Sequence, residues 1–461
     1  MLFDDGPLSD TIRLHLPQGD IPGFAMGVVH NGELIYVRTG GSTNREHPAP
    51  ITEQTLFRIG STTKILSAIA IGELVETGLL DLDVPVTNYM EHLAFRPPFD
   101  VSTVTLRMLL SHKSGLPNGP ADYFPTGPRQ GLEALVDEVR RYPLIAPPGR
   151  VASYSNIAVC LAAHIAEHVA GQSFNALMKD LVLDPLNLSR TTFEPSVAMT
   201  HQVALSHIQD EAGVLRINRE AADNPRYHPG AFAFSTVEDL ARLTSMLAST
   251  KDSFLTQMRT PHSSWLTADG LTYGLCLYLD RYLGRPRIGH DGRFHSNGSK
   301  IIVLPEDGIG VILLYNYADM IESHREALLD SAIMGFGLTA LPQTDQVDVP
   351  GAVDPSDFYG CYVGPNFEEV TLSPGYEDSF LTVDIGKGPI EVRMVTQNIF
   401  ESSLSCRQQW HSSPYNLGST LSLGLVDDVE GQDRYIMLNA RPYRAITNSP
   451  SRRALTTGIG R

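Results

Sequence analysis

The sequence is poor in cysteine. Its 461 residues include four, at Cys160, Cys276, Cys361 and Cys406, and no two of them form a C-x-x-C pair. Cysteines this far apart do not resemble a disulfide framework, a zinc ligand set or an iron–sulfur site. They are predicted to be small buried apolar side chains in a reducing compartment, and no metal or other cofactor is expected.

Basic residues and long apolar runs are also scarce. The chain has 35 Lys and Arg against 52 Asp and Glu, which gives a formal net charge of -17. Such a charge repels phosphate backbones and anionic lipid surfaces. No apolar run reaches the roughly 18 residues of a membrane span, and the N-terminal "MLFDDGPLSD" has acids where a signal peptide has bases. We therefore expect a cytoplasmic protein without a nucleic-acid or membrane partner.

The order of strand and helix patterns predicts an α+β domain over residues 1–340. Residues 24–38 contain Asn31-Gly32 between two apolar runs, a strong hairpin signal. Helical stretches separated by Pro and Gly then fill a subdomain over about 81–230, and three β-rich runs return between 271 and 316. Strands from both ends of this domain should form one antiparallel sheet flanked by helices.

The C-terminal quarter has a different character. Residues 341–356 are rich in Pro, Asp and Ala without any periodicity and are predicted to be a linker. Short β-rich runs then recur about every ten residues over 357–461. This pattern predicts an all-β domain that forms a small barrel, either over a site in the first domain or beside it.

The segment "FRIGSTTK", residues 57–64, has the strongest chemical signal. Ser61 follows a glycine, and Lys64 lies one helical turn later at the start of an apolar run, so its amine can reach the serine hydroxyl. Serine needs a base to become a nucleophile, and burial favours the neutral form of lysine that can act as one. It is the only S-x-x-K in the chain, although such a short motif has little weight alone.

Four ordered blocks resemble the serine β-lactamase and penicillin-binding-protein family, including its esterase and D-aminopeptidase branches. Besides "FRIGSTTK" they are "TLRMLLSHKSGLP" (105–117), with lysine at 113 where threonine is usual, "PPGRVASYSN" (147–156) and "GHDG" (289–292). The resemblance implies a β-lactamase/DD-peptidase-like fold for the first domain. It also implies that the C-terminal domain is a lipocalin-like barrel.

The same resemblance assigns roles to individual residues. Ser61 is the nucleophile, Lys64 and Tyr154 relay its proton, and which of the two is the base stays open. Asn156 is expected to hydrogen-bond Lys64 and the substrate amide.

The remaining roles fall on the "GHDG" block and its neighbour. The backbone N–H groups of Ser61 and Arg293 form the expected oxyanion hole. Asp291 and Gly292 are expected to bind substrate. His290 stands where the β-lactamases carry lysine, and a neutral imidazole does not demand a substrate carboxylate.

These roles predict a serine hydrolase that forms an acyl-enzyme on an amide or ester, such as a D-amino-acid peptide, a D-amino-acid amide or a small ester. One alternative is an acyltransferase or peptide cyclase of natural-product biosynthesis, resembling the thioesterases of the penicillin-binding type, that takes a carrier-bound or thioester acyl donor. A second alternative is a binding module that has lost its activity.

Two further patterns are interpreted conservatively. "HIAEH" (164–168) matches a spelling found in zinc peptidases, but it has no matching acidic ligand downstream and is predicted to be a solvent-facing polar patch. Trp265, Tyr273 and Tyr315 are expected to pack in the core or at a rim.

Overall fold

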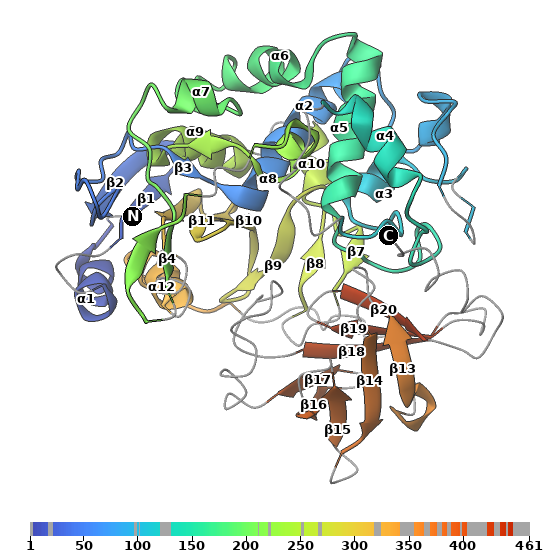
Figure 1. Ribbon diagram of the computed structural model, residues 1–461. Helices are drawn as coiled ribbons and strands as arrows, with labels where there is room; N and C mark the ends of the chain where they lie inside the picture. The colour runs from blue at the N-terminus through green and yellow to red at the C-terminus, as the bar shows by residue number, and fades with distance from the viewer. Residues whose placement is uncertain are drawn as a thin grey trace.

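The structure is a computed structural model of the chain (Figure 1). It describes residues 3–16, 22–95, 99–100, 102–119, 131–210, 212–219, 223–249, 253–265, 270–317, 324–341, 355–363, 369–375, 380–384, 389–396, 399–402, 422–427, 434–438 and 441–445.

An eight-stranded antiparallel sheet organises the N-terminal three-quarters of the chain. Its strand order is β2-β1-β12-β11-β10-β9-β8-β7. The strands are β1 (Phe24–His30), β2 (Glu33–Gly40), β7 (Ser263–Ser264), β8 (Thr272–Tyr273), β9 (Tyr278–Tyr282), β10 (Arg285–Phe294), β11 (Asn297–Leu304) and β12 (Ile309–Tyr315). Strands from the two ends of this region thus lie side by side, as the sequence predicts.

The first hairpin has the predicted turn. Asn31 and Gly32 both adopt positive φ angles, of 50° and 88°, which is what a two-residue turn of this twist requires. β1 then pairs with β12 in register from Phe24 opposite Tyr315 to His30 opposite Ile309. The earliest strand of the domain is therefore held by one of its latest.

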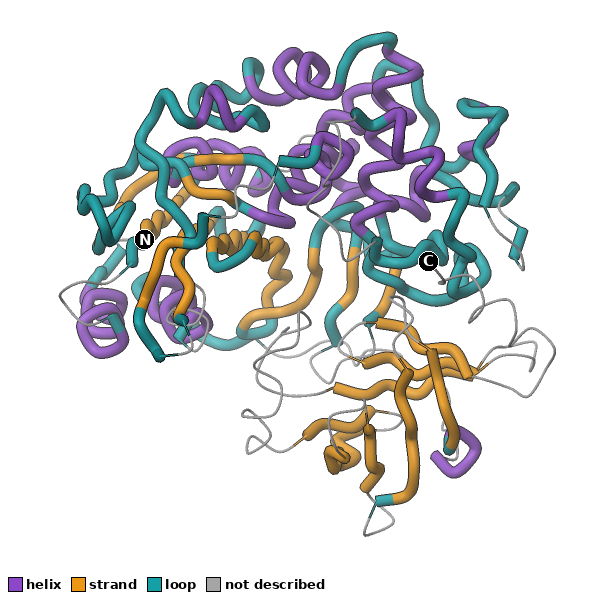
Figure 2. Tube along the Cα trace, in the orientation of Figure 1, coloured by secondary structure: helices purple, strands orange, loops and turns teal. Residues whose placement is uncertain are grey.

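Helices cover both faces of the sheet (Figure 2). Alternate residues of β12 face opposite ways, so Val311 and Leu313 join one buried cluster and Ile312 and Leu314 the other. The first cluster contains side chains of α1 (Gly6–His15) and α12 (Arg325–Met334). The second contains those of α2 (Thr63–Glu76) and α9 (Val237–Ala248).

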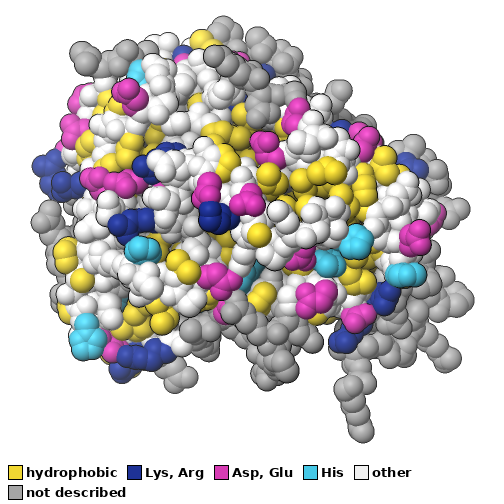
Figure 3. Space-filling model, turned by 90° about the horizontal axis from the view of Figure 1, so that it is seen from above, with side chains coloured by type: hydrophobic (Ala, Val, Ile, Leu, Met, Phe, Trp, Pro, Cys, Tyr) yellow, Lys and Arg dark blue, Asp and Glu magenta, His cyan; other side chains and the backbone are white. Residues whose placement is uncertain are grey.

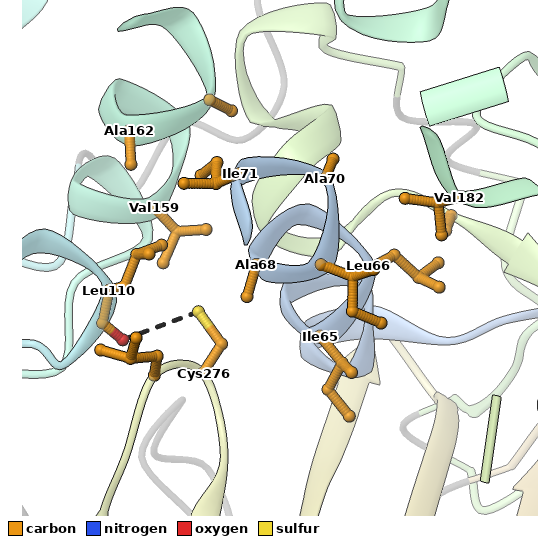
Figure 4. Close-up of a cluster of buried hydrophobic side chains, with 14 of the residues drawn as sticks. Ile65, Leu66, Ala68, Ala70, Ile71, Leu110, Val159, Ala162, Val182 and Cys276 are labelled. Atoms are coloured by element: carbon orange, nitrogen blue, oxygen red, sulfur yellow. Dashed lines mark hydrogen bonds between the residues drawn. The ribbon is translucent and has the colours of Figure 1, made fainter. Parts of the chain in front are cut away.

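Helix α2 is buried on nearly all sides, which matches its apolar sequence. Figure 4 shows Ile65, Leu66, Ala68 and Ile71 pointing outward into a surrounding shell of other elements. That shell includes Leu110, Val159, Ala162, Val182 and Cys276, whose thiol contacts the Leu110 carbonyl at 3.6 Å. Because α2 is enclosed in this way, the residues of its first turn, including Lys64, are held in place.

The middle of the chain is mainly helical, as predicted. Its helices are α3 (Leu106–Leu110), α4 (Glu133–Val139), α5 (Asn156–Ala170), α6 (Phe174–Met178), α7 (Pro195–Ala198) and α8 (His228–Ala231), followed by α10 (Ser253–Met258) before the sheet resumes. Two small antiparallel pairs interrupt them, β3 (Phe57–Arg58) with β6 (Phe234–Ser235) and β4 (His207–Gln209) with β5 (Leu215–Ile217). Short 3₁₀ and π-helical segments link these elements at Gly60–Thr62, Val86–Asn88, Lys179–Leu183 and Pro225–Tyr227. On the face seen from above in Figure 3, acidic and basic side chains are interspersed.

The described residues of the C-terminal region form strands after a short 3₁₀ turn at Pro355–Phe358. Each strand pairs antiparallel with the next, and the first also pairs with the last, which closes the order. The strands are β13 (Gly360–Val363), β14 (Glu369–Pro374), β15 (Phe380–Asp384), β16 (Pro389–Thr396), β17 (Ile399–Ser402), β18 (Ser422–Asp427), β19 (Arg434–Leu438) and β20 (Arg441–Ala445). The predicted linker at 341–356 lies almost entirely outside the described residues.

The cysteines only partly follow the expectation of burial. Cys160 and Cys276 are buried, but Cys361 on β13 is exposed, which corrects the sequence prediction for that residue. It pairs with Thr371 at the barrel surface and lies at an outward position of its strand. Cys406 lies outside the described residues.

No helix among the described residues is both long enough and apolar enough to cross a membrane.

Candidate active site

Ser61 lies on the 3₁₀ turn Gly60–Thr62, which runs directly into α2. A chain of buried hydroxyls ties this turn to β11. Ser299 Oγ donates to the Ile59 carbonyl at 2.7 Å, which leaves Thr62 to donate to Ser299 at 2.7 Å. The nucleophile candidate is therefore fixed from two directions, by the buried helix after it and by the sheet beside it.

Lys64 lies one turn later with its amine fully enclosed. Its Nζ is 2.8 Å from Ser61 Oγ, 2.6 Å from Asn156 Oδ1 and 2.6 Å from the Gly230 carbonyl oxygen. The side chain is 0% exposed. Burial lowers the pKa of Lys64 to about 8, against the weaker opposing effect of Cys160 and Cys276. A substantial fraction of this lysine is thus neutral in mildly alkaline solution.

The three partners of Lys64 differ in what they can donate. Asn156 Oδ1 and the Gly230 carbonyl only accept hydrogen bonds, whereas the Ser61 hydroxyl can also donate one. A neutral amine has two N–H bonds and one lone pair. Its N–H bonds go to the two pure acceptors, so the lone pair faces the serine proton.

Asn156 begins α5, and its amide orientation is set by a residue that the sequence analysis did not select. Asn118 Oδ1 accepts from Asn156 Nδ2 at 3.0 Å, and the Asn118 carbonyl accepts from the Asn156 N–H at 3.1 Å. Because Asn156 Nδ2 is engaged there, its Oδ1 is turned to Lys64. Asn118 lies directly after the quoted block that ends in "SGLP", which is the signal that could have identified it.

Tyr154 comes from the segment before α5 and lies next to both Lys64 and His112. Lys64 Nζ is 5.0 Å from the centroid of the Tyr154 ring. The imidazole of His112 packs against the same ring with centroids 4.3 Å apart. The structure therefore brings together Ser61, Lys64, Tyr154 and Asn156, which come from two separate segments of the sequence.

His290 lies on β10, with its ring 6.4 Å from that of Tyr154. Its Nδ1 donates to the Asp291 carbonyl, because a carbonyl can only accept. Nε2 must then be the acceptor for the Tyr273 hydroxyl, at 2.9 Å. Burial lowers the pKa of His290 to about 4, so the ring is neutral at ordinary pH with both nitrogens engaged. Tyr273, expected only to pack, is thus also the hydrogen-bond partner of His290, which no local sequence signal indicates.

Gly60, Gly292 and Arg293 mark a very close approach of two backbones. A Cβ added to Gly292 would lie 1.9 Å from the Ile59 carbonyl oxygen and 2.6 Å from Ser61 N. A Cβ added to Gly60 would lie 2.4 Å from Arg293 N. The amides of Ser61 and Arg293, the predicted oxyanion hole, thus belong to two segments in direct contact that only glycine permits.

Asp291 is the predicted site residue whose side chain is directed elsewhere. Its carboxylate lies 3.5 Å from Arg325 Nη1 on α12, at the opposite face of the sheet from His290. Burial alone would raise the pKa of Asp291, but Arg325 and Lys300 outweigh it and the pKa is lowered. The Asp291 carboxylate therefore binds α12, and only its backbone carbonyl contacts His290.

The "HIAEH" segment lies on α5, and its first histidine is not solvent-facing, which corrects the sequence prediction. His164 is buried and its Nδ1 lies 3.0 Å from Glu167 Oε2. Glu167 Oε1 in turn accepts from the Phe174 N–H at 3.0 Å. Both side chains are thereby used to join α5 to α6. Within the described ranges, no group of three His, Cys, Asp or Glu is placed to hold a metal ion.

The fold and these contacts define a β-lactamase-like protein with a serine and a buried lysine side by side. The Beta-lactamase family profile matches residues 8–332, and the chain belongs to this family. The family supports a serine hydrolase or acyl-transferring activity in general. Penicillin-binding protein 4 of Amycolatopsis lactamdurans is 28% identical over 337 residues, which are 68% of this chain and 86% of that protein. Protein flp of Staphylococcus aureus strain MW2 is 24% identical over 67% of this chain, and the match spans only 62% of flp.

Solved structures show the same fold. The octameric penicillin-binding protein homologue from Pyrococcus abyssi is 23% identical, with a TM-score of 0.64 over 96% of this chain and 100% of that one. SurE, in a crystal structure with D-Leu, is 20% identical, with a TM-score of 0.71 over 95% and 97%. A class C β-lactamase from Rhodobacter sphaeroides is 22% identical, with a TM-score of 0.60 over 72% and 99%.

Proposed function

We propose that the protein is a serine hydrolase that forms an acyl-enzyme through Ser61 on an amide or ester. The observation that carries this proposal is the set of partners around Lys64 Nζ. Two of them only accept hydrogen bonds, so the lone pair of the neutral amine is left facing Ser61, 2.8 Å away. The chain supports such a base with complete burial and a pKa of about 8.

In the proposed reaction, Ser61 Oγ bonds to the substrate carbonyl carbon while its proton moves to Lys64 Nζ. The carbonyl oxygen becomes an oxyanion and is stabilised by the amides of Ser61 and Arg293. The bond to the leaving amine or alcohol then breaks, while Tyr154 gives its phenol proton to that group and takes the proton held by Lys64. Water next attacks the ester of Ser61, one of its protons passes to Ser61 Oγ, and the acid is released.

His290 argues for a substrate without a carboxylate at this position. A lysine there would present a fixed positive charge, but the imidazole is neutral and both of its nitrogens are engaged. A carboxylate would meet neither a cation nor a free N–H at this side chain. This favours esters, amides and peptides over free acids, and D-amino-acid-containing peptides or amides are the preferred class.

The structural likeness to SurE bears on the alternative of acyl transfer. That structure contains D-Leu, and the match covers 95% of this chain. We therefore keep an acyltransferase or peptide cyclase as the second candidate, with an amine of the substrate in place of water and a free or carrier-bound acyl donor. We likewise interpret the C-terminal barrel as lipocalin-like and the protein as cytoplasmic, without a cofactor.

An activity-based label tests the first half of the mechanism. A fluorophosphonate should modify Ser61, as read by mass spectrometry of the peptide that contains it. Ser61→Ala should abolish the label, whereas Ser67→Ala should not. Ser67 is a matched control because it lies on the same buried helix but donates to the Pro229 carbonyl, outside the site. If several electrophiles leave Ser61 unlabelled, the binding-module alternative replaces the enzyme.

A panel of substrates tests the second half. One D-amino-acid dipeptide is presented with its C-terminus as the free acid, the amide or the methyl ester, and cleavage of the same peptide bond is measured with and without an added amine. The p-nitrophenyl ester of its N-terminal residue is the chromogenic reference substrate. We expect turnover of the amide and ester to exceed that of the acid, and the acid product to dominate without added amine. A product that is mostly the amine adduct or a cyclic peptide selects the transferase, and preference for the free acid contradicts the interpretation of His290.

A further inference from the structure

His112 makes three separate contacts around Tyr154. Its carbonyl accepts from the Ser153 N–H at 2.7 Å, and its Nδ1 accepts from the Ser155 N–H at 3.2 Å. Its ring packs on the Tyr154 ring with centroids 4.3 Å apart and planes at 40°. His112 therefore contacts three consecutive residues. Its carbonyl binds Ser153, its ring packs on Tyr154 and its Nδ1 binds Ser155.

The backbone of His112 is held in a conformation that glycine would adopt more easily. Its φ is 59°, and it follows the last turn of α3. The Lys113 N–H bonds to the Met108 carbonyl at 2.8 Å, and the His112 N–H to the Leu109 carbonyl at 3.4 Å. This is the Schellman pattern, in which glycine is the usual residue at the His112 position. A side chain at this φ strains the backbone, so the presence of an imidazole calls for a compensating contact.

Hydrogen bonds of the imidazole do not offset this strain fully, because only one of its two ring nitrogens has a described partner. Because Nδ1 accepts from Ser155, the ring proton is on Nε2. Nε2 is buried and has no hydrogen-bond partner among the described residues. Burial lowers the pKa of His112 well below its ordinary value, and the neighbouring Lys64 lowers it further. The ring thus remains neutral beside the site, and what it provides is its shape and one acceptor.

We propose that His112 is a positioning residue that holds the Tyr154 phenol in the orientation for proton transfer. This rests on the role of Tyr154 in the proposed function. Two neighbouring hydrogen bonds also hold the residues that follow Tyr154. Ser155 Oγ donates to the Pro117 carbonyl at 2.6 Å, and Asn118 binds Asn156. His112, however, reaches Ser153 and Ser155, on the two sides of Tyr154, and also the Tyr154 ring.

A double-mutant cycle tests the proposal. His112→Gly suits the positive φ and keeps the backbone bond to Ser153, so it is expected to fold while losing the ring and Nδ1. It should lower kcat about 10- to 100-fold, the size expected when a reacting group is misplaced. His112→Asn, which tolerates this φ and offers Oδ1 near the place of Nδ1, should recover part of the loss.

In a Tyr154→Phe background no phenol remains to be positioned. There, His112→Gly should change the residual kcat by less than about twofold. The matched control is His207→Ala, which removes another buried imidazole that accepts a backbone N–H, from Arg45 at 3.2 Å. It should lower the melting temperature and leave kcat within about twofold of wild type. Equal losses of kcat from His112→Gly with and without Tyr154 would overturn the proposal.

A measurement on the wild-type protein does not depend on any variant. Nitrogen-15 NMR of histidine-labelled protein should show the His112 ring as the neutral Nε2–H tautomer from pH 5 to pH 9. An Nδ1–H tautomer or an imidazolium in this pH range would overturn the proposal that His112 positions Tyr154. The proposed function is contradicted by a different result, namely a Ser61→Ala variant that turns over substrate as fast as the wild-type protein.

Discussion

Gly60 and Arg293 approach so closely that a Cβ on Gly60 would lie 2.4 Å from the Arg293 amide nitrogen. Gly60 also has a positive φ of 52°. Two penalties therefore fall on any side chain at this position, one from the backbone conformation and one from the contact. Measuring the two penalties separately shows whether the close approach of the Ser61 and Arg293 amides matters for activity.

Gly60→Ala should lower both stability and activity, and Gly171→Ala separates the two penalties. Gly171 has a similar φ of 64°, but an added Cβ there meets nothing within 4 Å. Gly171→Ala should cost about 1–2 kcal/mol of unfolding free energy and leave kcat unchanged. Gly60→Ala should cost a further 1–3 kcal/mol or so and reduce kcat strongly by moving the Arg293 amide. Denaturant melts and kcat on both variants check this, and equal effects would mean that the contact is harmless.

Tyr154→Phe should slow turnover by about 10² to 10⁴, the usual contribution of a general acid or base. The ring and its packing on His112 are retained, so the melting temperature should change little. The loss should fall on kcat, and KM should stay close to wild type because the phenol is assigned no binding role. Steady-state kinetics on the p-nitrophenyl ester measure both. Rates like those of wild type would show that the proton path avoids Tyr154.

Local sequence patterns predict the antiparallel sheet with its flanking helices and the contact between Lys64 and Ser61. The Asn31-Gly32 turn, the apolar helix after Ser61 and the return of strands near residue 300 each depend on local patterns, and the structure follows them. Lys64 reaches Ser61 because residues three apart lie on one helix face. Such local geometry is what a sequence encodes most directly.

The partners that the sequence did not predict depend on contacts between distant segments. Tyr273 on β8 contacts His290 on β10, and Asn118 contacts Asn156 where a loop packs against the start of α5. Asp291 was predicted at the site because it lies within "GHDG", but strand alternation turns its side chain toward α12. The polarity of His164 predicts a surface position, but the side chain is buried and bonded to Glu167.

Asn118 should matter because it orients Asn156, and two substitutions test this. Asn118→Ala removes the acceptor of the Asn156 amide and should lower kcat about tenfold, about the worth of one lost hydrogen bond to a positioned group. Asn118→Asp keeps an acceptor but adds a negative charge near Lys64. That charge favours the ammonium form and raises the pKa of Lys64, so the pH at half-maximal kcat should move upward. An unchanged pH profile in Asn118→Asp would contradict the proposed chain from Asn118 through Asn156 to Lys64.

The pH profile of the wild-type protein tests the base directly. Burial lowers the pKa of Lys64 to about 8, so kcat/KM should rise about tenfold per pH unit below pH 8 and level off above it. His290 has a pKa of about 4 and should add no break near pH 6.5. The unfolded chain keeps the Lys64 proton up to about pH 10.5, so between pH 8 and that value it binds more protons than the folded protein. The contribution of Lys64 to stability should therefore rise with pH across this window. A profile with its only break near pH 6.5 would assign the base to a histidine and remove Lys64 from that role.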